Sequence, residues 1–136
     1  MIRALIAVAA MGAAVAASPV AAQQTAPVGK WLAEDINGGG VVDRLQTTLE
    51  IAENGQVTGS GGCNRYHGMV EFSITAVNFG PLASTKMACP PAAMEQETKF
   101  HKALAEAKAW RIDAGTRKLT LLDVKGGELM RLSPLE

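Results

Sequence analysis

The chain has 136 residues, with 13 basic and 13 acidic side chains, so its formal net charge is zero. This length fits one ordinary domain around a single core. Because the Lys and Arg residues form no block of like charge, we expect no nucleic-acid partner and regard anionic membrane surfaces as poor candidates, since proteins bind both through clustered positive charge.

Residues 1–22 have the pattern of a secretory signal peptide. Arg3 supplies a positive start, residues 4–17 form an apolar run, and Ala22 ends a stretch of small residues suited to cleavage. The run is shorter than the roughly 20 residues that cross a bilayer. The first cysteine is Cys63, so no lipid-accepting cysteine follows the cleavage site. We therefore predict a periplasmic protein with no stable membrane anchor.

The mature chain is predicted to consist of a short leader and one domain. Residues 23–29 contain Pro27 and no apolar period, which indicates a flexible leader. Residues 30–136 then form the domain, which we expect to be a monomer. Without Arg3, the mature chain carries 12 basic and 13 acidic residues, close to neutrality.

Short β-type segments separated by turn residues come next, a pattern typical of an antiparallel sheet or small barrel. The first is predicted at residues 31–36. Residues 45–51 alternate apolar and polar side chains and so predict a strand with one inward face. Asn54 and Gly55 then predict a tight hairpin that leads to a return strand at residues 57–60.

The middle of the chain changes from strands to a helix. Residues 61–68 are predicted to be a glycine-rich loop, followed by strands at 69–72 and 74–79. Residues 94–108 are rich in helix-forming residues and follow two prolines. One face of this helix carries an apolar stripe predicted to pack on the sheet, made of Phe100, Ala103, Leu104 and Ala107.

The other face of the helix is predicted to be solvated, and its charged residues are Glu95, Glu97, Lys99 and Lys102. Closing strands are predicted at residues 110–112, 119–122 and 129–132.

The two cysteines are the strongest candidates for chemistry. In an oxidising compartment we expect a disulfide between Cys63 and Cys89, which are 26 positions apart. Such a bond is worth roughly 3–4 kcal/mol in the chain-entropy account. Three alternatives stay open: a zinc site with His67 and His101, a cysteine nucleophile with one of these histidines as base, and two free thiols.

Other catalytic patterns are absent from the sequence. Ser60 lacks the glycine two positions earlier that a nucleophile elbow needs, because Thr58 stands there. The Gly59-x-Gly61 pair stops short of a dinucleotide-binding fingerprint, because Asn64 occupies the third glycine position. We therefore predict no catalytic residues, no metal and no cofactor.

Two motifs resemble a known family. The run from Gly61 to Tyr66, which reads GGCNRY, and the run from Leu82 to Cys89, which reads LASTKMAC, are similar to the META domain, typified by the heat-shock protein HslJ. The resemblance implies an α+β fold, a strongly bent, partly open antiparallel β-barrel packed with one α-helix. It also implies an envelope location and, in some members, a link to stress tolerance, antibiotic resistance or motility. It supplies no catalytic residues.

These observations leave two hypotheses of function. The first is a non-catalytic periplasmic module for envelope stress or interaction with an unknown envelope protein. The second is a binding protein that holds a hydrophobic ligand, a lipid tail or an apolar peptide, in the open barrel. Four methionines either form an adaptable binding surface or fill the core: Met69, Met87, Met94 and Met130.

Three motif residues form a possible interaction patch: Asn64, Arg65 and Tyr66. The competing interpretation is structural. In that interpretation Asn64 suits a turn, Arg65 pairs with a carboxylate on a neighbouring strand, and Tyr66 is a core or rim aromatic.

Overall fold

The computed structural model describes Gly12 and residues 26–135. The predicted signal peptide, Gly12 apart, and residues 23–25 of the predicted leader lie outside the described residues. The described part contains one α-helix, one short 3-10 helix (Asp43–Leu45) and nine strands. Their bounds are β1 Gly29–Ile36, β2 Thr48–Ile51, β3 Gln56–Ser60, β4 Arg65–Phe72, β5 Val77–Phe79, β6 Ala83–Ser84, α1 Pro91–Glu106, β7 Ala109–Ile112, β8 Leu119–Leu122 and β9 Glu128–Pro134.

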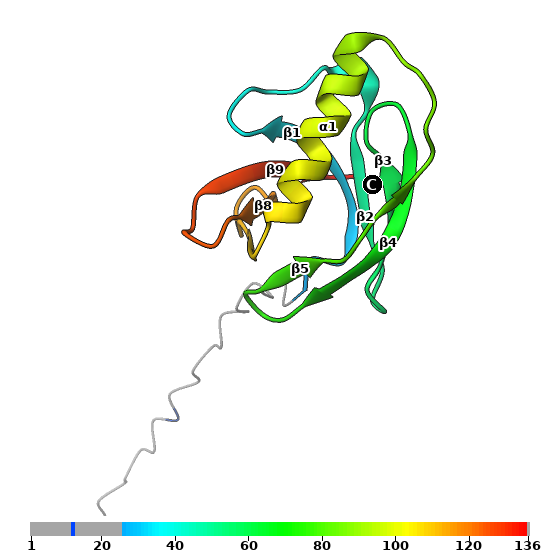
Figure 1. Cartoon of the computed structure of the whole chain (residues 1–136). Coiled ribbons are helices and arrows are strands. Elements are labelled where there is room, and N and C mark those ends of the chain that lie inside the picture. Colours follow the sequence, from blue (N-terminus) through cyan, green and yellow to red (C-terminus); the bar gives the residue numbers. More distant parts are fainter. Residues whose placement is uncertain (1–11, 13–25, 136) are drawn as a thin grey trace, which may run out of the picture.

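The strands form one antiparallel sheet in the order β5-β4-β3-β2-β1-β9-β8-β7, with β6 paired to β4. The sheet curls on itself and α1 lies against it (Figure 1). The two outer strands, β5 and β7, do not pair along their length. The described residues around them form one bridge, between Ala76 and Ala109, and two hydrogen bonds beside it, from Val77 N to Lys108 O and from Trp110 N to Thr75 O. The barrel is therefore nearly closed with an unsealed seam, which confirms the predicted α+β, partly open barrel.

The hairpin between β2 and β3 forms where the sequence predicts it. Gly55 has a φ of +87°, and a Cβ atom there would lie 2.6 Å from the carbonyl oxygen of Val70. Both the left-handed backbone and the close approach of β4 require glycine at this turn. Strand β2 is shorter than predicted, because Gln46 takes a φ of +47° and ends the 3-10 turn before it.

The predicted loop at residues 61–68 is wrong in its second half. Strand β4 begins at Arg65, because residues 65–68 pair with β3 on one side and residues 66 and 67 pair with β6 on the other. The predicted strand at 74–79 shrinks to β5, and Ile74 is 74% exposed in the turn before it.

The core fills the inside of the curled sheet. The helix begins at Pro91, and its apolar stripe is buried as predicted, with Phe100, Ala103, Leu104 and Ala107 all 0% exposed. The sheet contributes inward side chains that are equally inaccessible, Leu49, Val57, Leu119, Leu121, Met130 and Leu132. Side chains of the described strands and of α1 therefore occupy the interior of the barrel.

The folded part starts before the predicted boundary at residue 30. Pro27 is fully buried and its carbonyl oxygen accepts a hydrogen bond of 3.0 Å from the indole nitrogen of Trp31. Residues 27–29, assigned to the leader from the sequence, therefore pack as part of the domain. No helix in the described part of the chain is long and apolar enough to cross a membrane.

Candidate functional site

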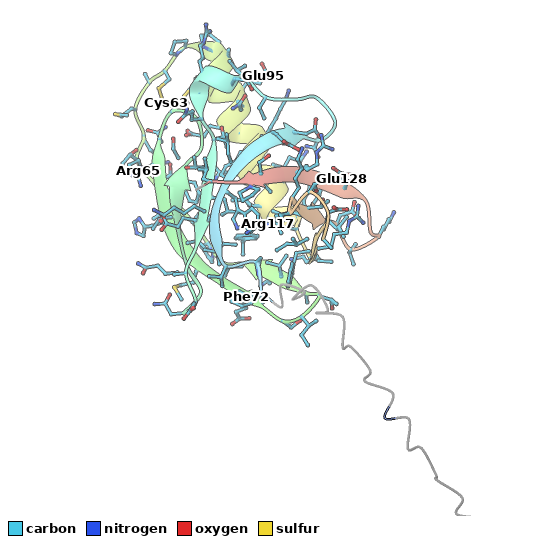
Figure 2. All side chains as sticks on the ribbon, turned by 180° about the vertical axis from the view of Figure 1, so that it is seen from behind. Cys63, Arg65, Phe72, Glu95, Arg117 and Glu128 are labelled. Atoms are coloured by element: carbon cyan, nitrogen blue, oxygen red, sulfur yellow. A yellow bond between two sulfur atoms is a disulfide. The ribbon has the colours of Figure 1, made fainter. Side chains whose placement is uncertain are left out.

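The two cysteines form a disulfide at the end of the barrel where α1 begins. Cys63 follows β3 and Cys89 precedes the helix, with their Cα atoms 6.0 Å apart. Figure 2 shows Cys63 toward the same end as Glu95, with Phe72 at the opposite end. The predicted pairing is confirmed, and it replaces the free-thiol, zinc and nucleophile alternatives, because both sulfurs are bonded to each other.

Glycine residues before Cys63 allow the helix to approach this loop. A Cβ atom on Gly61 would lie 2.7 Å from Cγ of Glu97, so only glycine leaves room for that side chain. Gly62 has a φ of +128°, a backbone conformation that other residues rarely adopt. The glycine run therefore serves a close contact between the loop and α1.

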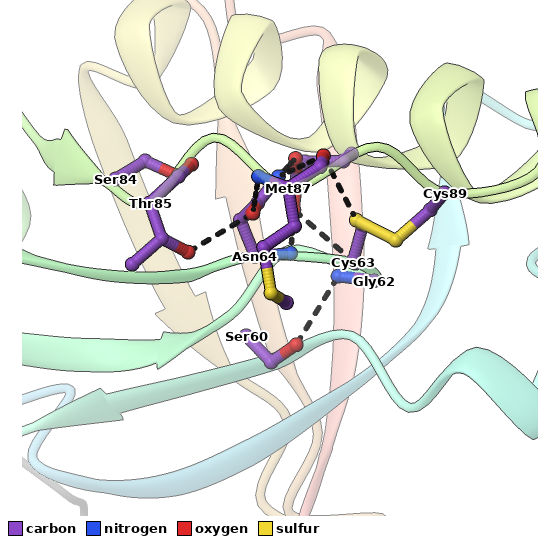
Figure 3. Close-up of a disulfide and its surroundings, with 9 residues drawn as sticks. Ser60, Gly62, Cys63, Asn64, Ser84, Thr85, Met87 and Cys89 are labelled. Carbon is purple, nitrogen blue, oxygen red and sulfur yellow. Dashed lines mark hydrogen bonds between the residues drawn. A yellow bond between two sulfur atoms is a disulfide. The ribbon is translucent and has the colours of Figure 1, made fainter.

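Asn64 is the centre of a buried hydrogen-bond network (Figure 3). Its side chain is 2% exposed, and its amide nitrogen donates to Oε2 of Glu97 at 2.8 Å. Its amide oxygen accepts from Oγ1 of Thr85 at 2.9 Å and from the backbone nitrogen of Met87 at 2.7 Å. One side chain thus joins the β3–β4 loop, the segment before Cys89 and the helix.

Glu97 completes this network from α1. Its Oε1 atom accepts from the backbone nitrogens of Asn64 at 2.6 Å and of Cys63 at 3.2 Å. Burial raises the pKa of Glu97, but the hydrogen bonds from Asn64 and Cys63 outweigh it, so the pKa lies below its usual value. The carboxylate is therefore ionised at neutral pH and held by three donors.

A second chain of hydrogen bonds runs beside the first. The amide nitrogen of Gln96 donates to Oγ1 of Thr47 at 2.8 Å, and that hydroxyl donates to the carbonyl oxygen of Gly61 at 3.0 Å. The backbone nitrogen of Val42 donates to Oε1 of Gln96 at 2.6 Å. Gln96 thus ties the loop after β1 to the helix.

The prediction that Glu97 lies on the solvated face of the helix is wrong, because Glu97 is 7% exposed. Glu95 and Lys99 do face solvent, where they form an exposed salt bridge of 3.2 Å. Periodicity could not separate Glu97 from them, because its burial depends on the glycine loop packed against it. The glycine at position 61 was the one feature of the sequence that could have indicated a close contact with the helix.

The three residues of the predicted interaction patch do not share a surface. Asn64 and Tyr66 are each 2% exposed and point inward, whereas Arg65 between them is exposed, as the alternation of a strand requires. The Tyr66 hydroxyl donates to the carbonyl oxygen of Thr48 at 2.6 Å. The structure therefore corrects the patch: Asn64 and Tyr66 hold the fold together.

His101 lies on α1 next to this network. Its ring meets the rings of Tyr66 and Phe100 edge to face, with centroids 5.3 and 5.5 Å away. Burial lowers the pKa of His101, and the nearby charge of Glu97 offsets only part of that shift. Its Nε2 atom is buried without a hydrogen-bond partner among the described residues.

A groove of about 570 Å³ runs between α1 and the segment that contains β6. Its lining residues are Phe79, Gly80, Pro81, Leu82, Ser84, Lys86, His101 and Ala105. This volume is within the usual range of small-molecule sites, about 300–1,000 Å³.

None of the four methionines lines this groove. Met130 is a core residue, but Met69, Met87 and Met94 are 54%, 58% and 38% exposed, so the core-filling interpretation is wrong for these three. They lie on β4, on the segment before Cys89 and on α1, and their exposure shows that they face solvent and not the core.

No group of three or more His, Cys, Asp or Glu residues within residues 26–135 is arranged to hold a metal ion.

The chain matches the family model of the META domain over residues 24–134. The chain belongs to the META domain family. The match is to the META domain as a whole, and the closer likeness to HslJ stays a prediction. Comparison with curated proteins gives no match.

Two solved structures share the fold of this META domain. An NMR structure of a protein from Burkholderia xenovorans superposes with a TM-score of 0.64 at 21% sequence identity, covering 79% of this chain and 81% of its own. A second NMR structure gives a TM-score of 0.58 at 25% identity, covering 78% of this chain and 88% of its own.

Proposed function

We propose that this META domain is a non-catalytic periplasmic module that acts by binding, in support of the cell envelope under stress. The observation that carries the proposal is that two cysteines and a buried glutamate, side chains that could take part in catalysis, are bonded to other groups of the protein. The sulfurs of Cys63 and Cys89 are bonded to each other, and Glu97 is held by three hydrogen bonds inside the protein. Residues occupied in this way stabilise the fold and leave little capacity for catalysis.

Family membership supports a non-catalytic domain, and the disulfide is compatible with an oxidising compartment. The signal-peptide pattern of residues 1–22 supports export of the protein from the cytoplasm. Together these features favour a stable, exported binding module whose partner is an envelope protein.

The test is a deletion strain challenged with heat, detergent and envelope-targeting antibiotics. We expect lower survival, restored by the full chain but not by a form that lacks residues 2–22 and stays in the cytoplasm. Crosslinking in living cells followed by mass spectrometry then identifies the partner. Normal survival of the deletion strain contradicts the envelope role, and rescue by the cytoplasmic form contradicts export.

The second candidate function is binding of an apolar ligand, and the groove beside α1 favours it. Four apolar side chains, Phe79, Pro81, Leu82 and Ala105, line that groove, whereas buried side chains occupy the barrel interior. Native mass spectrometry after gentle extraction tests this candidate. A protein that is always free of ligand and takes up no fatty acid or peptide saturably removes it.

A further inference from the structure

Four of the eight residues that line the groove beside α1 have apolar side chains, and the Nε2 atom of His101, unpartnered among the described residues, is buried. Phe79, Pro81, Leu82 and Ala105 supply apolar atoms, and the proline has no backbone N–H to donate. The hydroxyl of Ser84 donates to the carbonyl oxygen of Thr85, so it is already used. An alkyl chain fits this lining better than a peptide, whose backbone groups would lose their hydrogen bonds to water.

Lys86 is the one lysine or arginine among the residues that line the groove, and hydrogen bonds hold the backbone segment that carries it. Lys86 is exposed and forms no salt bridge with any residue in the 26–135 range. Its neighbours Thr85 and Met87 both donate to the amide oxygen of Asn64, and Cys89 is anchored by the disulfide. The backbone that carries Lys86 is therefore held beside the groove, and the ammonium group has no salt-bridge partner among the described residues that would compete with an anion.

The charge of the groove suits a monoanion. Burial holds the pKa of His101 below its usual value, so its ring supplies no second positive charge at neutral pH. The ionised carboxylate of Glu97 lies near His101 and opposes further negative charge. A carboxylate needs one cation, whereas a phosphate monoester carries nearly two negative charges.

We propose that this groove binds an unbranched fatty acid, with its carboxylate paired to Lys86 and its alkyl chain against Phe79, Leu82 and Ala105. This inference rests on the second candidate function, ligand binding, and adds the chemical class of the ligand and the residue that selects it.

The test is displacement of a polarity-sensitive fluorescent fatty acid from the disulfide-bonded mature protein at pH 8, below the micelle concentration of each competitor. The competitors are dodecanoic acid, dodecanol and an apolar hexapeptide with a free C-terminal carboxylate. The variants are Lys86→Met, Ala105→Trp and the control Lys125→Met, which removes a cation in the exposed turn before β9. Position 105 is exposed on α1, so a tryptophan there fills the groove without entering the core.

We expect dodecanoic acid to bind about two- to fivefold more tightly than dodecanol, the range of an exposed ion pair. Lys86→Met abolishes that preference, Ala105→Trp weakens both ligands, and Lys125→Met keeps the preference.

Equal affinities for acid and alcohol in the unmodified protein, or a hexapeptide as strong as the acid, overturn this inference and leave ligand binding standing. Unchanged binding in Ala105→Trp also overturns it. Saturable binding of none of the three removes ligand binding itself.

Discussion

Replacing Asn64 with aspartate tests whether the buried network stabilises the domain. The change keeps the shape of the side chain but turns the donor that faces Oε2 of Glu97, 2.8 Å away, into a second carboxylate. Two buried carboxylates at this distance cannot both stay ionised, so the folded state must take up a proton that bridges them. Protonation costs about 1.4 kcal/mol for each pH unit above the ordinary Asp pKa of about 3.9, hence about 4 kcal/mol at pH 7.

The sign of the pH dependence follows from this proton. The folded variant binds one proton more than its unfolded chain, so its stability relative to the unmodified protein falls as pH rises from about 4 to 7. We expect a loss of about 4 kcal/mol at pH 7 and about 1.5 kcal/mol at pH 5. Urea unfolding followed by the fluorescence of the buried Trp31 and Trp110 measures both values with the disulfide kept oxidised.

The double variant Asn64→Asp, Glu97→Gln is the matched control. The new amide of residue 97 donates to the new carboxylate, while its oxygen still accepts from the backbone nitrogens of residues 63 and 64. We expect it to be at least about 2 kcal/mol more stable than Asn64→Asp at pH 7, with the steep pH dependence gone. A single variant within 1 kcal/mol of the unmodified protein, or a double variant no more stable than the single one, refutes the role of the network.

Three further predictions concern other parts of the fold. Cys63→Ser lowers the free energy of unfolding by roughly 3–4 kcal/mol, since it removes a link across 26 positions; a melting temperature equal to that of the oxidised protein contradicts this. Gly59→Ala places a methyl group against the carbonyl oxygen of Thr48 and costs about 2 kcal/mol or more, whereas Gly39→Ala, whose methyl group would lie in ordinary contact 3.6 Å from the carbonyl oxygen of Ile36, is nearly neutral; similar unfolding midpoints for both count against the close contact. Burial raises the pKa of Glu34, but hydrogen bonds from Ser133, Lys118 and Arg131 outweigh it and hold the pKa at about 2, below the ordinary 4.5. The stability that the Glu34 carboxylate contributes is therefore complete above about pH 4.5 and is lost as pH falls to about 2. Glu34→Gln should make the free energy of unfolding less dependent on pH in that range; an unchanged pH dependence shows that the carboxylate contributes nothing.

The features set by local chemistry were predictable from the sequence. The hairpin at Gly55 formed because Asn-Gly tolerates a positive φ, and the helix buried its stripe because the apolar residues recur at helical spacing. The link between Cys63 and Cys89 was predictable from the number of cysteines and the predicted compartment. Each of these signals lies within a short window of the chain or within a residue count.

The features set by tertiary pairing were not predictable in this way. Strand β4 begins at Arg65 because β3 and the two-residue β6 flank it, and β6 is too short to give a periodic signal. Glu97 is buried because Gly61 leaves a space beside it, 36 positions earlier in the chain. A charged residue on a helix is exposed in most proteins, so its own sequence context indicated the opposite.

The same residues that hold the fold also determine the shape of the groove beside α1. One wall of the groove is the helix and the other is the segment from Phe79 to Lys86. That segment is held to the rest of the molecule by β6, by the bonds of Asn64 to Thr85 and Met87, and by the disulfide at its far end. Because Glu97 attaches the helix to the same asparagine, the two walls share one anchor. The buried network therefore stabilises the domain and fixes the distance between the two surfaces that a ligand would contact.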